Sequence, residues 1–255
     1  MPGSLTHVWY FQQYAPSLNP LGAILPDYLP FDKSFRWEQT HDIPLMEEYR
    51  GRVVREDPHY RWLAEGMLHH ALADREVDSH HGLLKYLDGL NGDVEGILHK
   101  EVGELSGRQL TFLSDLLFDF IFDQQLLQRE PQFPEEIHYA IKTTSLEAVA
   151  QHLARFFDAK PSRLHRNLRY LRRMDFSTLT TSPEEATRVY LKQRDWNPDG
   201  DLLKKILGKG FKAAYLMHIF HRHKAQIDQI KASATAYFAQ IEPEISQRLK
   251  DIRLP

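Results

Sequence analysis

Residues 59–82 read HYRWLAEGMLHHALADREVDSHHG, and the helix-like spacing of apolar residues in this stretch is the main evidence for the predicted fold class. Its apolar residues recur every three or four positions, as in an amphipathic α-helix, and Gly82 is typical of a helix end. The second half is unusual, because four histidines and three acids fall between His69 and Gly82. An ordinary solvated helix would carry Lys and Glu instead. The segment is therefore predicted to be either a metal-binding helix or a crowded, exposed helix face.

The same helical period is found along most of the chain from about residue 46 onward, and no segment shows the alternation of a strand. Ser145 and Ser182 stand where N-cap residues are expected, and Pro161 and Pro183 lie in the first turns of two of the segments. The expected helices are 44–56, 59–81, 93–105, 106–130, 145–159, 161–174, 182–194 and a final stretch within 202–241. The sequence thus predicts an all-α protein.

The amino-terminal region differs from the rest, because five prolines fall between residues 16 and 44, at Pro16, Pro20, Pro26, Pro30 and Pro44. Proline interrupts helices, so we expect a short first helix around His7 and mostly loop after it. The predicted architecture is a multi-helix bundle with a proline-rich amino-terminal loop region. We expect residues 1–130 to form a metal-binding helical core and residues 131–255 a helical extension packed with it as one domain.

Composition limits the chemistry that is available. The chain of 255 residues contains no cysteine, which excludes disulfides, thiolate metal sites and a Cys nucleophile, so a metal must bind to His, Asp and Glu. A net charge of -3 gives no strong signal for nucleic acid. The sequence shows neither a leader pattern nor an uninterrupted apolar run, so a cytoplasmic protein without a transmembrane segment is expected. The oligomeric state is left open.

The helix at 59–82 can offer several metal ligands on one face. His70 and Asp74 lie one turn apart, and His81, seven residues further on, returns close to the same face. In a straight helix His80 points elsewhere. Two His and one carboxylate form an N/O set that suits zinc, with manganese or iron as alternatives, and such an ion activates a bound water.

Three residues near the amino terminus extend this set. His7 lies in LTHVW, Asp27 ends the apolar run LGAILPD, and His41 follows in QTHD. This order, followed by a helix of the form H-x3-D-x5-H, resembles the zinc-dependent phospholipase C family, which is related in fold to the single-strand-specific zinc nucleases. The resemblance covers about residues 5–105 and implies an all-α fold with a zinc cluster that hydrolyses phosphodiesters.

Carried over residue by residue, the resemblance assigns Asp27, His41, His70, Asp74 and His80 as metal ligands, while His7 matches in order only. It selects His80 where helix geometry selects His81, and both stay candidates. The final His-x3-Glu of the family is not reproduced, and the family's proline before the third His is missing. The nearest substitute is LHKEVGEL, in which Glu101 or Glu104 would complete the site.

Two further interpretations stay open. LGAILPDYLP is also similar to HD-type phosphohydrolases, including the acyl carrier protein phosphodiesterases, but the only adjacent His-Asp pair is His41-Asp42 in a predicted loop. Asp115, Asp119 and Asp123 recur every four residues and are expected to face solvent or the basic helix 163–173, with a metal or general-base role for Asp119 as the alternative.

The predicted function is a metal-dependent hydrolase that acts on a small phosphoester through a metal-bound water. The alternative from another class is a non-catalytic helical protein that uses the same scaffold to bind a partner.

Overall fold

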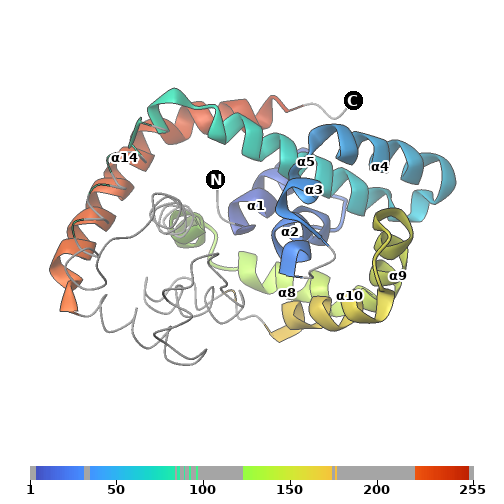
Figure 1. Cartoon of the computed structure of the whole chain (residues 1–255). Coiled ribbons are helices and arrows are strands. Elements are labelled where there is room, and N and C mark those ends of the chain that lie inside the picture. Colours follow the sequence, from blue (N-terminus) through green and yellow to red (C-terminus); the bar gives the residue numbers. More distant parts are fainter. Residues whose placement is uncertain are drawn as a thin grey trace.

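Helices form all of the secondary structure that is described in the computed structural model of this chain (Figure 1). The structure describes residues 4–31, 35–83, 85–86, 89, 92, 96, 123–173, 176 and 222–252. The predicted all-α class is confirmed. The elements are α1 (Ser4–Tyr14), α2 (Leu21–Tyr28), η1 (Leu29–Phe31), α3 (Trp37–His41), α4 (Ile43–Glu56), η2 (Pro58–Tyr60), α5 (Arg61–Asp78), α8 (Phe133–Thr143), α9 (Leu146–Phe157), α10 (Pro161–Leu168), η3 (Arg169–Arg173) and α14 (Lys224–Lys250).

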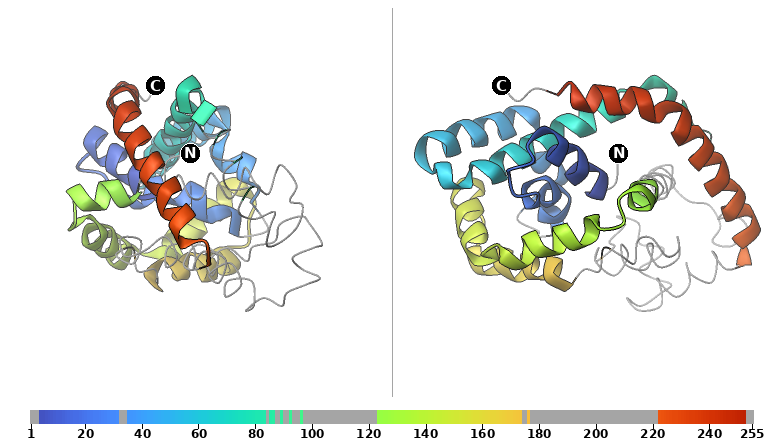
Figure 2. Two further views of the ribbon diagram at one scale, coloured as in Figure 1. Left: turned by 90° about the vertical axis from the view of Figure 1, so that its left-hand side faces the viewer. Right: turned by 180° about the vertical axis from the view of Figure 1, so that it is seen from behind.

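The first helices are enclosed by later ones. Figures 1 and 2 show α1, α2 and α3 between α5, which runs beside α4, and a layer made by α8 and α10. The long α14 contacts α1 and α5 and then extends beyond them. Buried apolar side chains from all of these regions form one hydrophobic core cluster. Since residues on both sides of position 130 contribute to it, the division into 1–130 and 131–255 stays a prediction.

Helix boundaries follow local sequence signals where the chain is described. The Ser145 side chain accepts a hydrogen bond from the backbone N–H of Ala148 and caps α9, as predicted, and Pro161 begins α10. The expected helix at 182–194, that at 93–105 apart from residue 96, and the segments 106–122 and 202–221 lie outside the described residues, while residues 224–241 form part of α14.

The prediction of a mostly irregular amino-terminal region was wrong. Residues 21–28 form α2, with Pro26 inside it, and 37–41 form α3. Proline blocks a helix only where its ring or its missing N–H conflicts with the preceding turn. Pro26 stands in the second turn of a helix of eight residues, and burial of Leu21, Ile24 and Leu25 offsets its cost.

A backbone contact between two glycines sets the distance between α2 and α5. A Cβ atom on Gly66 would lie 2.6 Å from the carbonyl carbon of Gly22, and one on Gly22 would lie 2.7 Å from the carbonyl oxygen of Trp62. Only glycine fits such a close approach. His70 and Asp74 follow Gly66 by one and two turns and therefore share the face of α5 that meets α2.

None of the described helices combines the length and the apolar character that crossing a membrane requires.

We predict that Gly22→Ala and Gly66→Ala each lower the free energy of unfolding by about 1–3 kcal/mol, because the added methyl group forces the two helices apart. The matched control is Gly51→Ala in α4, where the new Cβ meets only the end of the Arg55 side chain at 3.5 Å. Helix propensity then raises stability by up to about 1 kcal/mol. Chemical denaturation measures all three variants. Three stabilised variants would contradict the close contact.

Candidate metal centre

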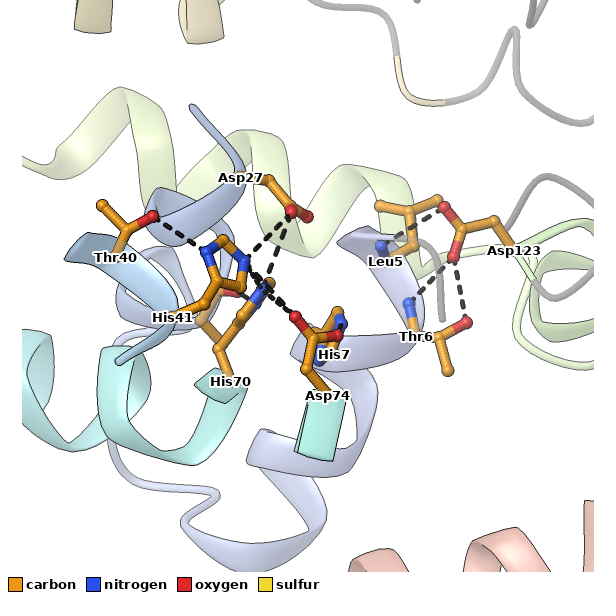
Figure 3. A network of polar contacts seen from close by, with 10 residues as sticks. Leu5, Thr6, His7, Asp27, Thr40, His41, His70, Asp74 and Asp123 are labelled. Carbon is orange, nitrogen blue, oxygen red and sulfur yellow. Dashed lines mark hydrogen bonds and ion pairs between the residues drawn. The ribbon is translucent and has the colours of Figure 1, made fainter. Parts of the chain in front are cut away.

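Five of the predicted metal ligands, which are far apart in the sequence, lie together in the structure (Figure 3). Four helices contribute these residues. They are His7 from α1, Asp27 from α2, His41 from the end of α3, and His70 and Asp74 from α5. Two overlapping groups, His7/His70/Asp74 and Asp27/His41/His70, each have ligand atoms within 4.8 Å of one another and can hold a metal ion.

The imidazoles of His41 and His70 form the centre of the cluster. Their Nε2 atoms are 3.2 Å apart. Asp27 Oδ1 lies 3.6 Å from His70 Nε2 and 3.8 Å from His41 Nε2. Ligand atoms that bind one ion at 2.0–2.2 Å are separated by roughly 3–4 Å, so these spacings fit a shared ion.

Asp74 directs its two oxygens to different imidazoles. Oδ2 lies 3.3 Å from His41 Nε2 and 3.6 Å from His70 Nε2, whereas Oδ1 lies 3.0 Å from His7 Nε2. The carboxylate therefore connects both groups. His7 stacks on His70 with 3.7 Å between the ring centroids, which places it against the buried side of the cluster.

Hydrogen bonds outside the cluster orient two of the imidazoles. His70 Nδ1 lies 2.7 Å from the carbonyl oxygen of Ala23, and because a carbonyl only accepts, this nitrogen carries the proton. Thr40 donates its hydroxyl hydrogen to the carbonyl oxygen of Pro26, so its oxygen accepts from His41 Nδ1 at 2.9 Å. Both Nε2 atoms are left as acceptors, which is the tautomer that a metal-ligating histidine needs.

The atoms around His70 Nε2 therefore repel one another without a cation. Burial and the nearby His7 lower the pKa of His70 to about 4, so its ring is neutral near pH 7. The neighbouring atoms are another imidazole nitrogen and carboxylate oxygens, all of which are acceptors. Buried acceptors need a donor or a cation to offset their lost hydration. The arrangement fits a metal ion.

Both carboxylates are ionised at neutral pH. Burial alone raises the pKa of Asp74, but the imidazoles of His7 and His70 outweigh it and hold that pKa below its usual value. The same opposition occurs at Asp27, where His70, His41 and His7 hold the carboxyl pKa far below its usual range. Two ionised carboxylates are thus held close together in a largely buried cluster, and their negative charge attracts a cation.

Buried polar atoms at the cluster also favour a cation. His7 Nδ1 and Asp74 Oδ1 are buried, and neither has a hydrogen-bond partner in the described part of the chain. Asp74 Oδ1 lies 3.0 Å from His7 Nε2. A buried carboxylate oxygen without a hydrogen-bond donor fits a site that binds a cation.

The four histidines of the 59–82 helix have different environments. They do not form one exposed, solvated helix face, because three of the four are buried. His70 lies in the cluster. His69 packs between Phe11 and Tyr14, and burial lowers its pKa to about 3. His80 is buried next to α14, and His81 is exposed.

Neither His80 nor His81 joins the two groups, so the structure supports neither of these alternatives for the third helix ligand. His80 Nδ1 accepts a hydrogen bond from the backbone N–H of Leu83, and its Nε2 lies 3.2 Å from Glu244 on α14. The helix ends at Asp78, which turns His80 away from the face of His70 and sends His81 into solvent.

None of the remaining predicted site residues is placed at the cluster by the described part of the structure. Glu101, Glu104 and Asp119 lie outside the described residues. Asp42, the partner of His41 in the HD-type interpretation, caps α4 by accepting a hydrogen bond from the backbone N–H of Leu45 at 2.8 Å. Asp42 is in neither group that can hold a metal ion, so only the His of that pair lies at the site.

Sequence reasoning missed Thr40, and it misplaced Asp123. Asp123 was expected to face solvent or the basic helix 163–173, but it is fully buried against the first turn of α1. Burial raises its pKa to about 7, although hydrogen bonds from Thr6 and Leu5 lower it. The available signal was its place in the apolar stretch LLFDFIFDQQLL, a composition that favours burial of the segment.

Comparison with known proteins gives no relative for this chain: no family model, no curated protein and no solved structure matches it.

We predict that His70→Ala and Asp74→Ala abolish metal binding, while His81→Ala retains it. His80→Ala should also keep the metal, but its melting temperature should fall because it loses the contacts to Leu83 and Glu244. Elemental analysis after resupply with zinc, manganese or iron measures the metal. Intact sites bind tightly enough to retain far more than about 0.2 ion per chain. Metal loss in His81→Ala equal to that in His70→Ala would refute the cluster as the site.

Proposed function

We propose that this protein is a metal-dependent hydrolase of phosphoesters, with its metal held by Asp27, His41, His70 and Asp74 and with His7 beside the second oxygen of Asp74. The observation that carries the proposal is the set of imidazole and carboxylate atoms around His70 Nε2, which lie 3.2–3.6 Å from it. A divalent cation would bind all of them together.

The donor set supports a borderline transition metal. Imidazole and carboxylate ligands without thiolate suit zinc, manganese and iron, and a carbonyl or hydroxyl partner behind each imidazole is the usual arrangement around such ions. Zinc is our first choice, because it binds imidazole and carboxylate ligands and can expand to five-coordinate, which leaves a position for water beside two imidazoles and two carboxylate oxygens. Calcium and magnesium prefer sites made of oxygen alone.

The burial of the ligands determines where a substrate can approach. The side chains of His70 and His7 are 0% and 1% exposed, whereas His41 is 10% and Asp27 is 20% exposed. The cluster is thus closed on the side of α1 and α5 and meets solvent on the side of Asp27 and His41. A small anionic substrate would reach the ion from this side.

The ligand charges favour hydrolysis of an anionic ester. The two ionised carboxylates, Asp27 and Asp74, give the ligand set negative charge that a divalent ion offsets, so an incoming phosphoryl group meets less repulsion. A metal in such a site lowers the pKa of a bound water toward neutrality and stabilises charge on the phosphoryl oxygens. The protein itself would hold the ion, leave the side of Asp27 and His41 accessible to substrate, and exclude bulk water from the side of α1 and α5.

The sequence resemblance supports phosphoesters as the substrate class. Both families that the amino-terminal half resembles hydrolyse phosphoesters at a metal site in an all-α fold. The resemblance to the zinc-dependent phospholipase C family rests on the residues that the cluster brings together, apart from His80. The HD-type alternative depends on Asp42, which lies at the start of α4 instead.

We predict that protein loaded with zinc or manganese hydrolyses bis(p-nitrophenyl) phosphate, with a rate that rises with pH near neutrality. Asp74→Asn should reduce the rate at least about 100-fold, because it removes a charged ligand, and the exposed His81→Ala is the matched control that keeps it. Release of p-nitrophenolate measures the rate. A metal-replete protein inactive on phosphodiesters, phosphomonoesters, phospholipids and single-stranded nucleic acid would favour the non-catalytic alternative.

A further inference from the structure

Asp123 is a buried carboxylate that lies close to the metal centre but belongs to neither metal-binding group. Its Oδ1 accepts hydrogen bonds from the backbone N–H of Thr6 at 3.0 Å and from the Thr6 hydroxyl at 2.9 Å. Its Oδ2 accepts from the backbone N–H of Leu5 at 3.3 Å. Figure 3 shows the carboxylate beside the first turn of α1, on the far side of that turn from Asp27.

These bonds cap a helix from a distant part of the sequence. The first N–H groups of a helix have no partner within the helix, and a side chain close by usually accepts from them. At α1 the carboxylate of Asp123, 117 residues from Thr6, is such an acceptor. Three hydrogen bonds to one carboxylate fix both the position and the rotation of the first turn.

His7 directly follows this anchored turn. The other two imidazoles are held through Nδ1, His70 by the carbonyl oxygen of Ala23 and His41 by the hydroxyl of Thr40. His7 Nδ1 has no such partner within the described residues. The place of its ring therefore depends on the backbone of α1 and on stacking against His70.

We propose that Asp123 is a positioning residue for the metal centre: it holds the first turn of α1 so that His7 lies against Asp74. The inference rests on the proposed function, because it takes the His7–Asp74 pair as part of the metal site. The three hydrogen bonds of Asp123 go to Leu5 and Thr6, the residues just before His7, so its effect on the ion passes through His7.

The test compares Asp123→Ala, His7→Ala and the double variant. Zinc affinity is measured by competition with a chromophoric chelator, well below the melting temperature of every variant. Each single substitution should weaken zinc binding by about 10–100-fold, as loss of supporting contacts does at other metal sites. The double variant should bind zinc as His7→Ala does, because Asp123 then has no imidazole left to position. An equal further loss in the His7→Ala background would overturn the proposal.

A second measurement does not need a metal. In metal-free protein, the imidazole NMR signal of His7, assigned by its absence in His7→Ala, should be shifted by the stacked His70 ring and should move in Asp123→Ala. An unmoved signal overturns the positioning role. If the signal moves but the wild-type protein binds no zinc, the proposed function fails and the positioning role of Asp123 stands.

Milder variants separate positioning from loss of folding. Thr6→Val removes the hydroxyl bond to Asp123 while keeping the shape of the side chain, and it should weaken zinc binding and move the His7 signal less than Asp123→Ala does. Thr6→Ser should behave as wild type. Ser145→Ala removes the cap of α9 and is the control for loss of a helix cap. Equal loss of zinc affinity in Ser145→Ala and Thr6→Val would overturn the proposal.

Discussion

The contact between the backbones of Gly22 and Gly66 is the constraint on which the metal centre depends. Because neither residue has a side chain, α2 and α5 approach until main-chain atoms touch. This approach brings the Ala23 carbonyl within 2.7 Å of His70 Nδ1 and places Asp27 within 3.6 Å of His70 Nε2. A larger residue at either position would separate the imidazole both from the group that orients it and from its neighbouring carboxylate.

The cluster brings several hydrogen-bond acceptors close together, and a bound cation would offset the repulsion between them. Burial raises the pKa of a carboxyl group, yet the carboxyl groups of Asp27 and Asp74 have lowered pKa values because imidazoles surround them. The imidazole of His70 meanwhile stays neutral. A bound ion would satisfy both kinds of ligand, so binding it adds directly to the stability of the folded state. Metal binding at this site would therefore be coupled to folding.

Residues outside the ligand set fix the geometry of the site. The carbonyl oxygen of Ala23 and the hydroxyl of Thr40 determine which nitrogen of each imidazole carries the proton. Asp123 anchors the helix that carries His7. The three supports come from different segments, so each ligand is oriented independently while Asp74 contacts the imidazoles of both groups.

The sequence by itself determined the all-α class, the chemistry of the ligands and the pairing of His70 with Asp74. These follow from periodicity, from the absence of cysteine and from i,i+4 spacing, all of which are local properties. Tertiary structure decided the rest. The end of α5 at Asp78 removed His80 and His81 from the cluster, and the carboxylate of Asp123 became a helix cap instead of a surface charge. These outcomes depend on contacts between residues that are far apart in the sequence, so a local sequence pattern does not predict them.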